Sequence, residues 1–324
     1  MQIRRDHGGG LDAPVAQFGG LRREWLDLST GINPVPYPIG EITQSSWNEL
    51  PDRDANDALV SAARLFWSVP DAATIIPASG ASALIAAMPR LHDGSQTGTA
   101  YIPTPTYNEH AAAFENHGIK VSDVNSSAPF RVFVHPNNPD GRLWRNAEIS
   151  SPGALLTVID ESFCDVTPAQ SHIARATEPG VVILKSFGKF WGLAGLRLGF
   201  AIAHPDTVAA TETNPSLRDM LGPWSVSGPA LTIGTNALRD TAWAMQTRER
   251  LHKDAARLDT LMARHGALIG GTDLFRLYDV GNATSFQERL ARHRIWSRVF
   301  PYSEGWIRLG LPAPQAWPRL EAAL

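Results

Sequence analysis

Residues 181–203 read VVILKSFGKFWGLAGLRLGFAIA, two apolar runs on either side of a glycine-rich turn. The runs at 181–184 and 198–203 lack two-residue alternation, which is typical of strands that are covered on both faces. Within the turn, Lys189 stands among aromatic residues. Aromatic neighbours can desolvate a lysine and favour its neutral, reactive amine, whereas an ordinary loop lysine is solvated. The segment therefore predicts two buried strands joined by a turn with a candidate reactive lysine.

Three further runs have the same apolar character, at residues 99–102, 131–134 and 155–159. Helical stretches separate these runs. Apolar residues recur with helical spacing from 55 to 66, for which Asp54 is the expected N-cap, and residues 108–117 predict another helix. Strands that alternate with helices indicate an α/β fold, with a mostly parallel sheet between helical layers.

The two ends of the chain predict separate structures. Residues 227–265 contain few helix breakers and predict a long helix that leads out of the sheet domain. A small α+β domain follows, in which residues 275–280 and 306–309 predict strands around a helix at 285–294. The first forty residues are rich in glycine and proline and predict an extended arm. We expect an arm at 1–43 that contributes to the small domain and the active site, a large domain at 44–235 and the small domain at 236–324.

Composition excludes several classes of protein. The 324 residues are 43% hydrophobic and 19% charged, which is typical of an ordered chain with a substantial core. Twenty-nine basic against 32 acidic residues give a net charge of -3, so we expect no nucleic-acid partner. Cys164 is the single cysteine, the first six residues lack the apolar run of a signal peptide, and no apolar run approaches the ~18 residues that span a bilayer. We expect a soluble protein of the reducing cytoplasm, with no membrane partner.

Nucleotide and metal motifs are missing. The spacing of Gly192, Gly195 and Gly199 differs from the dinucleotide fingerprint and precedes a strand, whereas that fingerprint follows one. Gly188-Lys189 lacks the next Ser or Thr, and the upstream Gly, of a phosphate-binding nucleotide loop. The sequence contains no His-Glu-x-x-His and no paired cysteines, so we expect no metal site.

A combination of residues at predicted strand ends carries a family resemblance. The run at 155–159 delivers Asp160 to the carboxyl edge of the sheet, where ligands of open α/β sheets bind. Ser186-x-x-Lys189, followed eight positions later by Arg197, resembles the cofactor-lysine segment of fold-type I pyridoxal-phosphate enzymes. The subgroup that the chain most resembles contains histidinol-phosphate aminotransferase and the threonine-phosphate decarboxylases of cobalamin biosynthesis, with similarities from His7 to Arg308. The resemblance implies that fold and the cofactor pyridoxal 5'-phosphate (PLP).

The resemblance also implies roles for residues around the cofactor ring. Lys189 is expected to hold the cofactor covalently and to move protons at the substrate. Asp160 is expected to pair with the pyridine nitrogen. Asn138, in the stretch HPNNPDG, is expected to bind the phenolic oxygen, and Tyr107 to stack on the ring. The structural alternatives are a helix-capping aspartate, an ordinary Asn-Pro turn and a core tyrosine.

The cofactor phosphate needs hydrogen-bond donors. Residues 78–84, ASGASAL, predict the start of a helix, where the first backbone N–H groups have no intrahelical partner. The resemblance places the phosphate among Gly80, Ala81, Ser82, Ser186 and Arg197.

Two positions differ from the aminotransferase pattern. Phe163 stands where aminotransferases of this subgroup usually carry a tyrosine that donates to the phenolic oxygen. Leu50-Pro51 stands where a Tyr-Pro pair usually reaches the cofactor phosphate of the neighbouring subunit. The resemblance thus implies a homodimer whose phosphate site is completed by some other group.

The chain ends are expected to recognise the substrate. Arg308, in WIRLG, matches an arginine that grips a substrate carboxylate or phosphate, and Arg298 resembles a second anion-binding arginine. The alternative for each is an ordinary surface arginine. The N-terminal residues resemble the decarboxylases more than the aminotransferases, and those expected to contact the substrate are His7, Gly8, Gly9 and Asn33.

Three functions are compatible with these residues. The resemblance at the N-terminal motif and Phe163 favours PLP-dependent decarboxylation of L-threonine O-3-phosphate to (R)-1-aminopropan-2-yl phosphate in cobalamin biosynthesis. The first alternative is an aminotransferase for a phosphorylated amino acid or amine such as histidinol phosphate. The second is a non-catalytic scaffold with the same fold.

Overall fold

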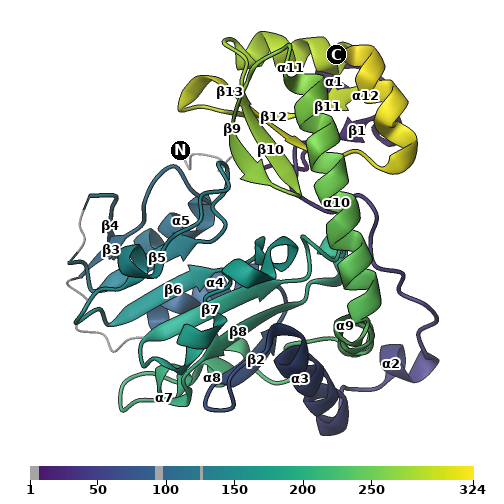
Figure 1. Cartoon of the computed structure of the whole chain (residues 1–324). Helices are drawn as coiled ribbons and strands as arrows, with labels where there is room; N and C mark the ends of the chain where they lie inside the picture. Colours follow the sequence, from purple (N-terminus) through teal and green to yellow (C-terminus); the bar gives the residue numbers. More distant parts are fainter. Residues whose placement is uncertain (1–6, 92–97, 125–126) are drawn as a thin grey trace. The chain divides into compact units, whose positions relative to one another are not determined.

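The computed structural model of the chain describes residues 7–91, 98–124 and 127–324 (Figure 1). These residues form two compact units, which we call the terminal unit and the sheet unit. The terminal unit contains the chain up to Pro36, Pro139–Gly141 and Gln246–Leu324, and the sheet unit contains Tyr37–Asn138 and Arg142–Met245. The boundaries expected at 43/44 and 235/236 therefore both fall inside the sheet unit.

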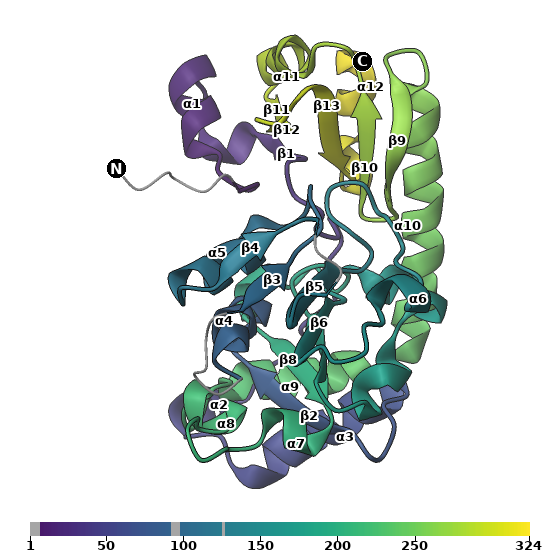
Figure 2. The same ribbon diagram turned by 90° about the vertical axis from the view of Figure 1, so that its left-hand side faces the viewer.

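A seven-stranded sheet runs through the sheet unit (Figures 1 and 2). In spatial order its strands are β2 (Thr74–Ala78), β8 (Gly199–Ala203), β7 (Val181–Ser186), β6 (Leu156–Asp160), β5 (Phe130–Val134), β3 (Thr99–Tyr101) and β4 (Lys120–Ser122). β8 pairs antiparallel with β2 and β7, and the other neighbouring pairs are parallel. The predicted α/β architecture and all five predicted strands of this sheet are confirmed.

β2 and β4 were not predicted, and the reasons differ. β2 contains Pro77, which cannot donate a hydrogen bond to a sheet ladder. It is tolerated there because β2 is the edge strand next to β8. β4 has three residues, none of them fully buried, so it lacks the apolar run that marks a central strand.

Helices cover this sheet. They are α2 (Gln44–Asn48), α3 (Arg53–Trp67), α4 (Ala81–Ala87), α5 (Asn108–Asn116), α6 (Asn146–Ile149), α7 (Pro205–Val208), α8 (Leu217–Leu221) and α9 (Gly228–Arg239). α4 packs on β2, β7, β8 and α5, while α3 packs on α9 and β2. The carboxylate of Asp52, not that of Asp54, caps α3 by accepting a hydrogen bond from Ala55 N at 2.7 Å. The N-cap prediction was wrong because α3 begins two residues before its apolar pattern does.

The long helix expected at 227–265 is two helices, α9 and α10 (Thr241–Met262). The chain breaks at Asp240, whose carboxylate accepts a hydrogen bond from Trp243 N at 2.9 Å and caps α10. The prediction missed this break because an aspartate before a threonine is a weaker signal than glycine or proline. The change of unit at Gln246 lies within α10.

The terminal unit has an α+β structure, as predicted. Its antiparallel sheet contains, in spatial order, β12 (Arg298–Phe300), β13 (Ser303–Gly310), β10 (Phe275–Asp279) and β9 (Ala267–Thr272). β1 (Leu26–Asp27) pairs in parallel with β11 (Ile295–Trp296), and the helices are α1 (Asp12–Phe18), α11 (Ala283–Arg292) and α12 (Trp317–Ala323). The N-terminal segment is not wholly extended, because α1 tolerates Pro14 in its first turn and ends at Gly19 (φ 76°).

Short 3-10 helices complete the secondary structure, at Arg22–Glu24, Met88–Arg90, Cys164–Val166, Pro168–Gln170, Ile173–Thr177, Ala194–Leu196 and Pro314–Ala316. Within the described ranges, no helix combines the length and the apolar character needed to cross a membrane.

Candidate active site

One cavity of the sheet unit collects most of the predicted cofactor residues. It encloses about 590 Å³, including space open to solvent. Eight predicted residues line it: Ala81, Ser82, Tyr107, Asn138, Asp160, Ser186, Lys189 and Arg197. The other lining residues are Ile85, Val134, Ser162, Phe163, Gly188 and Ala194. The cavity lies where β5, β6 and β7 end, the edge at which ligands of open α/β sheets bind.

Asp160 ends β6 and is buried, with 2% of its surface exposed. His110 Nε2 lies 2.9 Å from its Oδ2, and its Oδ1 accepts hydrogen bonds from Ser162 N at 2.9 Å and Ser162 Oγ at 2.5 Å. Burial alone would raise the pKa of Asp160, but the interactions with His110 and Ser162 outweigh burial and lower the pKa below its usual value. The site therefore holds an ionised carboxylate at the floor of the cavity.

His110 and Ser162 are functional neighbours that sequence reasoning missed. His110 lies in the first turn of α5, three residues after Tyr107, and the two rings meet edge to face at 6.1 Å. Ser162 lies two residues after Asp160, the spacing of an Asx turn. A search for donors near Asp160 by sequence spacing would find Ser162. Only the fold brings His110 to Asp160.

Lys189 lies half-buried in the turn between β7 and β8. Its Nζ is 5.3 Å from the centre of the Phe163 ring, so the amine faces an apolar side chain across the cavity. The turn closes through backbone hydrogen bonds from Gly192 N to Lys189 O at 3.1 Å and from Leu193 N to Phe187 O at 3.2 Å. These bonds fix the backbone from which Lys189 extends.

The predicted phosphate residues meet at the start of α4. Gly80 precedes α4 with φ 83°, a conformation that favours glycine, and a Cβ at this position would lie 2.7 Å from Arg197 Nη2. Gly80 does not line the cavity but lets Arg197 approach the chain. Ala81 and Ser82 follow it in the first turn of α4, where backbone N–H groups have no intrahelical acceptor.

Tyr107 and Asn138 lie on two different loops, and the side chain of Asn137 connects these loops through hydrogen bonds. Asn137 Nδ2 donates to Pro105 O at 3.0 Å, and Thr106 Oγ1 donates to Asn137 Oδ1 at 2.6 Å. Because Asn137 precedes Asn138 and Thr106 precedes Tyr107, this pair of bonds fixes both lining residues relative to each other.

The predicted substrate residues belong to the terminal unit. Arg308 lies on β13 directly opposite Arg298 on β12, and only 6% of its surface is exposed. Its Nη2 donates to Ser29 O at 2.7 Å, and its guanidinium lies 5.0 Å from the centre of the Phe275 ring. Like charges that face each other across strands repel, so this pair favours an anion nearby.

The glycines of the N-terminal motif pack on the same serine. A Cβ at Gly8 would collide with Ser29 O, and Gly9 N donates to Ser29 Oγ at 2.8 Å. Gly8, Gly9 and Arg308 therefore come together around Ser29. Asn33 is also buried, and its Oδ1 accepts hydrogen bonds from Val35 N at 3.0 Å and from Arg250 Nη2 at 2.7 Å. His7 is exposed.

The two positions at which the sequence differs from the aminotransferase pattern have different surroundings. Phe163 lines the cavity, and Leu50 is 67% exposed. Among the described residues, no group of three or more His, Cys, Asp or Glu side chains is placed to hold a metal ion.

The sequence matches the family "Aminotransferase class I and II" over residues 24–316, so the chain belongs to that family. The more particular similarity is to a threonine-phosphate decarboxylase from Pseudomonas aeruginosa, which is 38% identical over 98% of this chain and 97% of that protein. A threonine-phosphate decarboxylase from Sinorhizobium sp is 37% identical over 96% of this chain and 94% of that protein.

A solved structure supports the same fold. The histidinol-phosphate aminotransferase from Sinorhizobium meliloti, in complex with pyridoxal-5'-phosphate, superposes with a TM-score of 0.80 at 20% identity and covers 97% of this chain and 93% of that chain. The fold-type I architecture and the resemblance to this subgroup are therefore confirmed.

Proposed function

We propose that the chain is a PLP-dependent decarboxylase of L-threonine O-3-phosphate, which releases CO₂ and forms (R)-1-aminopropan-2-yl phosphate for cobalamin biosynthesis. The observation that carries this proposal is the two near-full-length threonine-phosphate decarboxylases at 38% and 37% identity. The cavity supports it chemically, because an amine, an ionised carboxylate and an arginine line one space.

The lining residues fit PLP. The cofactor has an aldehyde for Lys189, a pyridine nitrogen for the buried carboxylate of Asp160 and a phosphate for Arg197, Ser186 and the first turn of α4. Tyr107 offers an aromatic face and Asn138 an amide for the phenolic oxygen. When bound, PLP supplies an electron sink for the electrons that a broken bond leaves at the substrate Cα.

The protein residues divide the remaining work. Asp160 stays ionised because His110 and Ser162 hold it, and an ionised Asp160 keeps a proton on the pyridine nitrogen. Lys189 Nζ is the group that delivers a proton to Cα after CO₂ leaves. The pair Arg298 and Arg308 is proposed to bind the anionic groups of the substrate, beside Gly8 and Gly9, which pack on the same Ser29 as Arg308. His7 precedes these glycines, and Asn33 is proposed to act indirectly, because its Oδ1 already accepts two hydrogen bonds.

The runner-up is an aminotransferase for a phosphorylated amino acid or amine, which the same Lys189 and Asp160 would serve. Incubation with threonine phosphate, with CO₂ and keto acid measured together, distinguishes the two. We expect CO₂ without keto acid. A ketone phosphate and glutamate formed from histidinol phosphate and 2-oxoglutarate would establish the aminotransferase, and no turnover of any phosphorylated amino acid would establish the non-catalytic scaffold.

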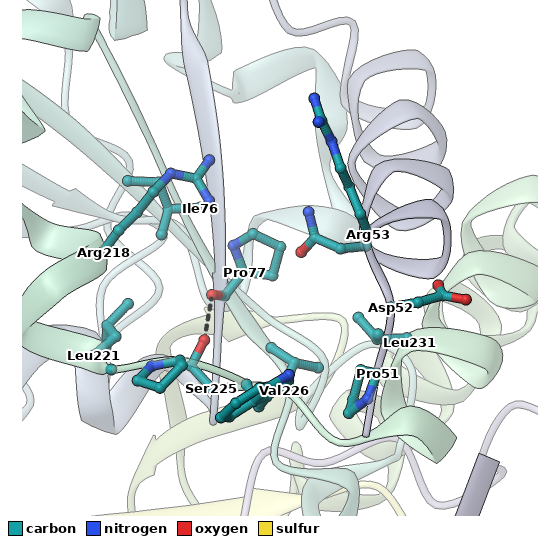
Figure 3. A pocket seen from close by; sticks show the side chains of 14 residues that line it. Pro51, Asp52, Arg53, Ile76, Pro77, Arg218, Leu221, Ser225, Val226 and Leu231 are labelled. Carbon is teal, nitrogen blue, oxygen red and sulfur yellow. Dashed lines mark hydrogen bonds between the residues drawn. The ribbon is translucent and has the colours of Figure 1, made fainter. Parts of the chain in front are cut away.

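We further propose a homodimer, supported by exposed apolar side chains beside a hollow of the sheet unit. Pro51, Arg53 and Arg218 line this hollow (Figure 3). Trp224 also lines it. Trp224 is 59% exposed, and the nearby segment of α2 carries Trp47, which is 66% exposed. A second copy would cover such residues.

Light scattering at assay concentration tests the homodimer, with Trp47→Glu as the disrupting variant. We expect a dimer for the natural chain and a larger monomer fraction for the variant. A fully active natural chain that is strictly monomeric would refute the homodimer.

We also propose a cytoplasmic location. The single cysteine, Cys164, is buried and forms no disulfide, which supports this location.

A further inference from the structure

Glu161 is a buried carboxylate next to Asp160 that the proposed reaction does not use. It is 1% exposed. Because neighbouring residues of an extended chain point to opposite sides, Asp160 lines the cavity while Glu161 points into the interior. Its Oε2 lies 2.6 Å from Lys185 Nζ and accepts from Ser171 Oγ at 2.6 Å, and its Oε1 accepts from His172 N at 2.5 Å. Glu161 thus joins three segments of the chain.

The Lys185 side of this network reaches the turn that carries Lys189. Lys185 Nζ also lies 3.6 Å from Asp165 Oδ1, and Lys185 is 2% exposed. Asp165 Oδ2 in turn accepts a hydrogen bond from Trp191 Nε1 at 3.2 Å. Trp191 lies two residues after Lys189 and stacks between Phe187 and Trp243, with ring centres 5.0 and 5.4 Å away. The indole is held by both its ring faces and its N–H.

The His172 side of the network reaches the loop that carries Asn138. His172 Nε2 lies 2.9 Å from Trp144 O, and Trp144 N donates to His135 Nδ1 at 3.0 Å. His135 Nε2 lies 2.7 Å from Gln170 O, so His135 donates from Nε2 and accepts at Nδ1. Asn138 is three residues farther along this loop. One set of buried contacts therefore links the segments of Asn138, Asp160 and Lys189.

We infer that Glu161, with Lys185, is a positioning residue that fixes these three segments at the distances the cofactor requires. Glu161 and Asp165 together hold Lys185 charged in the interior, where a lone ammonium would be unstable. Buried polar networks with all partners satisfied are rigid and specify one arrangement. This inference rests on the proposed function only in placing PLP at Lys189.

The test uses the full-length holoenzyme with Glu161→Gln as the main variant. Glutamine has nearly the size of glutamate but carries no charge. Lys185 retains Asp165 as an ion-pair partner in this variant, so the chain should fold. We expect PLP to bind about tenfold more weakly and kcat to fall roughly 10²-fold, because a displacement of about 1 Å at reacting groups costs that much. KM for threonine phosphate should change little, because its proposed ligands lie in the terminal unit.

Arg131→Met is the matched control. Arg131 is 3% exposed in the same sheet and donates to Ile149 O at 3.0 Å, at the start of β5 and outside the network. We expect Arg131→Met to lower the melting temperature while PLP affinity and kcat stay near the natural values. If Arg131→Met, at an equal loss of melting temperature, lowers PLP affinity as much as Glu161→Gln does, general instability is the cause and the inference fails.

Three further outcomes complete the test. Unchanged PLP affinity and kcat in Glu161→Gln would overturn the inference. Should Glu161→Gln fail to fold, Ser171→Ala removes one donor to Glu161, and weaker PLP binding at an unchanged KM then supports the inference, while natural PLP affinity overturns it. Borohydride reduction and peptide mapping of the natural enzyme give a separate result, because PLP on a residue other than Lys189 would overturn the proposed site itself.

Discussion

The arginine pair of the terminal unit allows a quantitative test of substrate recognition. Threonine phosphate carries a carboxylate and a phosphate, so a decarboxylase must hold two anions, whereas histidinol phosphate carries only the phosphate. Arg308 and Arg298 are directly opposite each other on β13 and β12, and Arg308 is almost fully buried. Arg308→Ala removes one of these two cations.

The expected size follows from the contacts of Arg308. A charge-assisted hydrogen bond in a buried site contributes about 1.5–3 kcal/mol, which corresponds to roughly ten- to 150-fold in kcat/KM. The variant also loses the 2.7 Å bond from Arg308 Nη2 to Ser29 O, a cost of about 1 kcal/mol in the free energy of unfolding. Relief of repulsion with Arg298 offsets part of that cost.

The assay is CO₂ release from threonine phosphate as a function of its concentration, with PLP content measured on the same samples. We expect kcat/KM to fall by one to two orders of magnitude while PLP stays bound. Arg276→Ala is the control, because Arg276 lies on the neighbouring strand β10 and forms an ion pair with Asp259 at 2.7 Å. It should lower stability and leave KM unchanged. Normal turnover of threonine phosphate by Arg308→Ala would show that Arg308 does not anchor the substrate.

Three predictions concern the cavity. Lys189→Ala should abolish the borohydride-reducible visible absorbance of bound cofactor, and persistence of that absorbance would exclude Lys189 as the attachment point. Asp160→Asn should lower the free energy of unfolding at neutral pH and flatten its decline in acid. The pKa of Asp160 is lower in the folded chain than in the unfolded chain, so its ionised form stabilises the fold above the unfolded pKa of about 3.9. This stabilisation is lost as pH falls through the lower folded pKa. Denaturation at several pH values measures the change. Phe163→Tyr should lower the pH midpoint of the cofactor absorbance, because a hydroxyl donor favours the charged phenolic oxygen; an unchanged midpoint would place Phe163 away from that oxygen.

The central strands could be predicted because their apolar pattern is local. β5, β6 and β7 are fully covered on both faces except at Ser186, so almost every residue in them is buried. β9 carries Gly270 and Gly271 and lacks that pattern. A Cβ at Gly270 would collide with the backbone oxygen of Asp140, which lies about 130 residues earlier in the chain. The need for glycine at position 270 therefore comes from a long-range contact.

The residues of the candidate site also divide into those that a local sequence pattern reveals and those that only the fold brings together. Lys189 and Arg197 were recognisable from the Ser-x-x-Lys pattern with an arginine eight positions later, and Asp160 was recognisable because it directly follows an apolar strand run. His110 was not, because 50 residues separate it from Asp160 and only the parallel pairing of β3, β5 and β6 brings α5 beside the end of β6. Glu161 and Lys185 were hidden for a different reason. Each stands next to a recognised motif, and the sequence does not reveal that both side chains point into the interior.

Charge can be compared between the residues that line the cavity and the buried cluster of Glu161, Asp165 and Lys185. The described lining of the cavity carries two basic side chains, Lys189 and Arg197, and one carboxylate, Asp160, so it suits a phosphate that bears nearly two negative charges at neutral pH. Behind the cavity, Glu161 and Asp165 enclose Lys185. Without both carboxylates, the buried Lys185 ammonium would lack a counter-charge and would be unstable in the interior. The buried network thus balances its own charge while, as we infer, it fixes the segments that carry Asn138, Asp160 and Lys189.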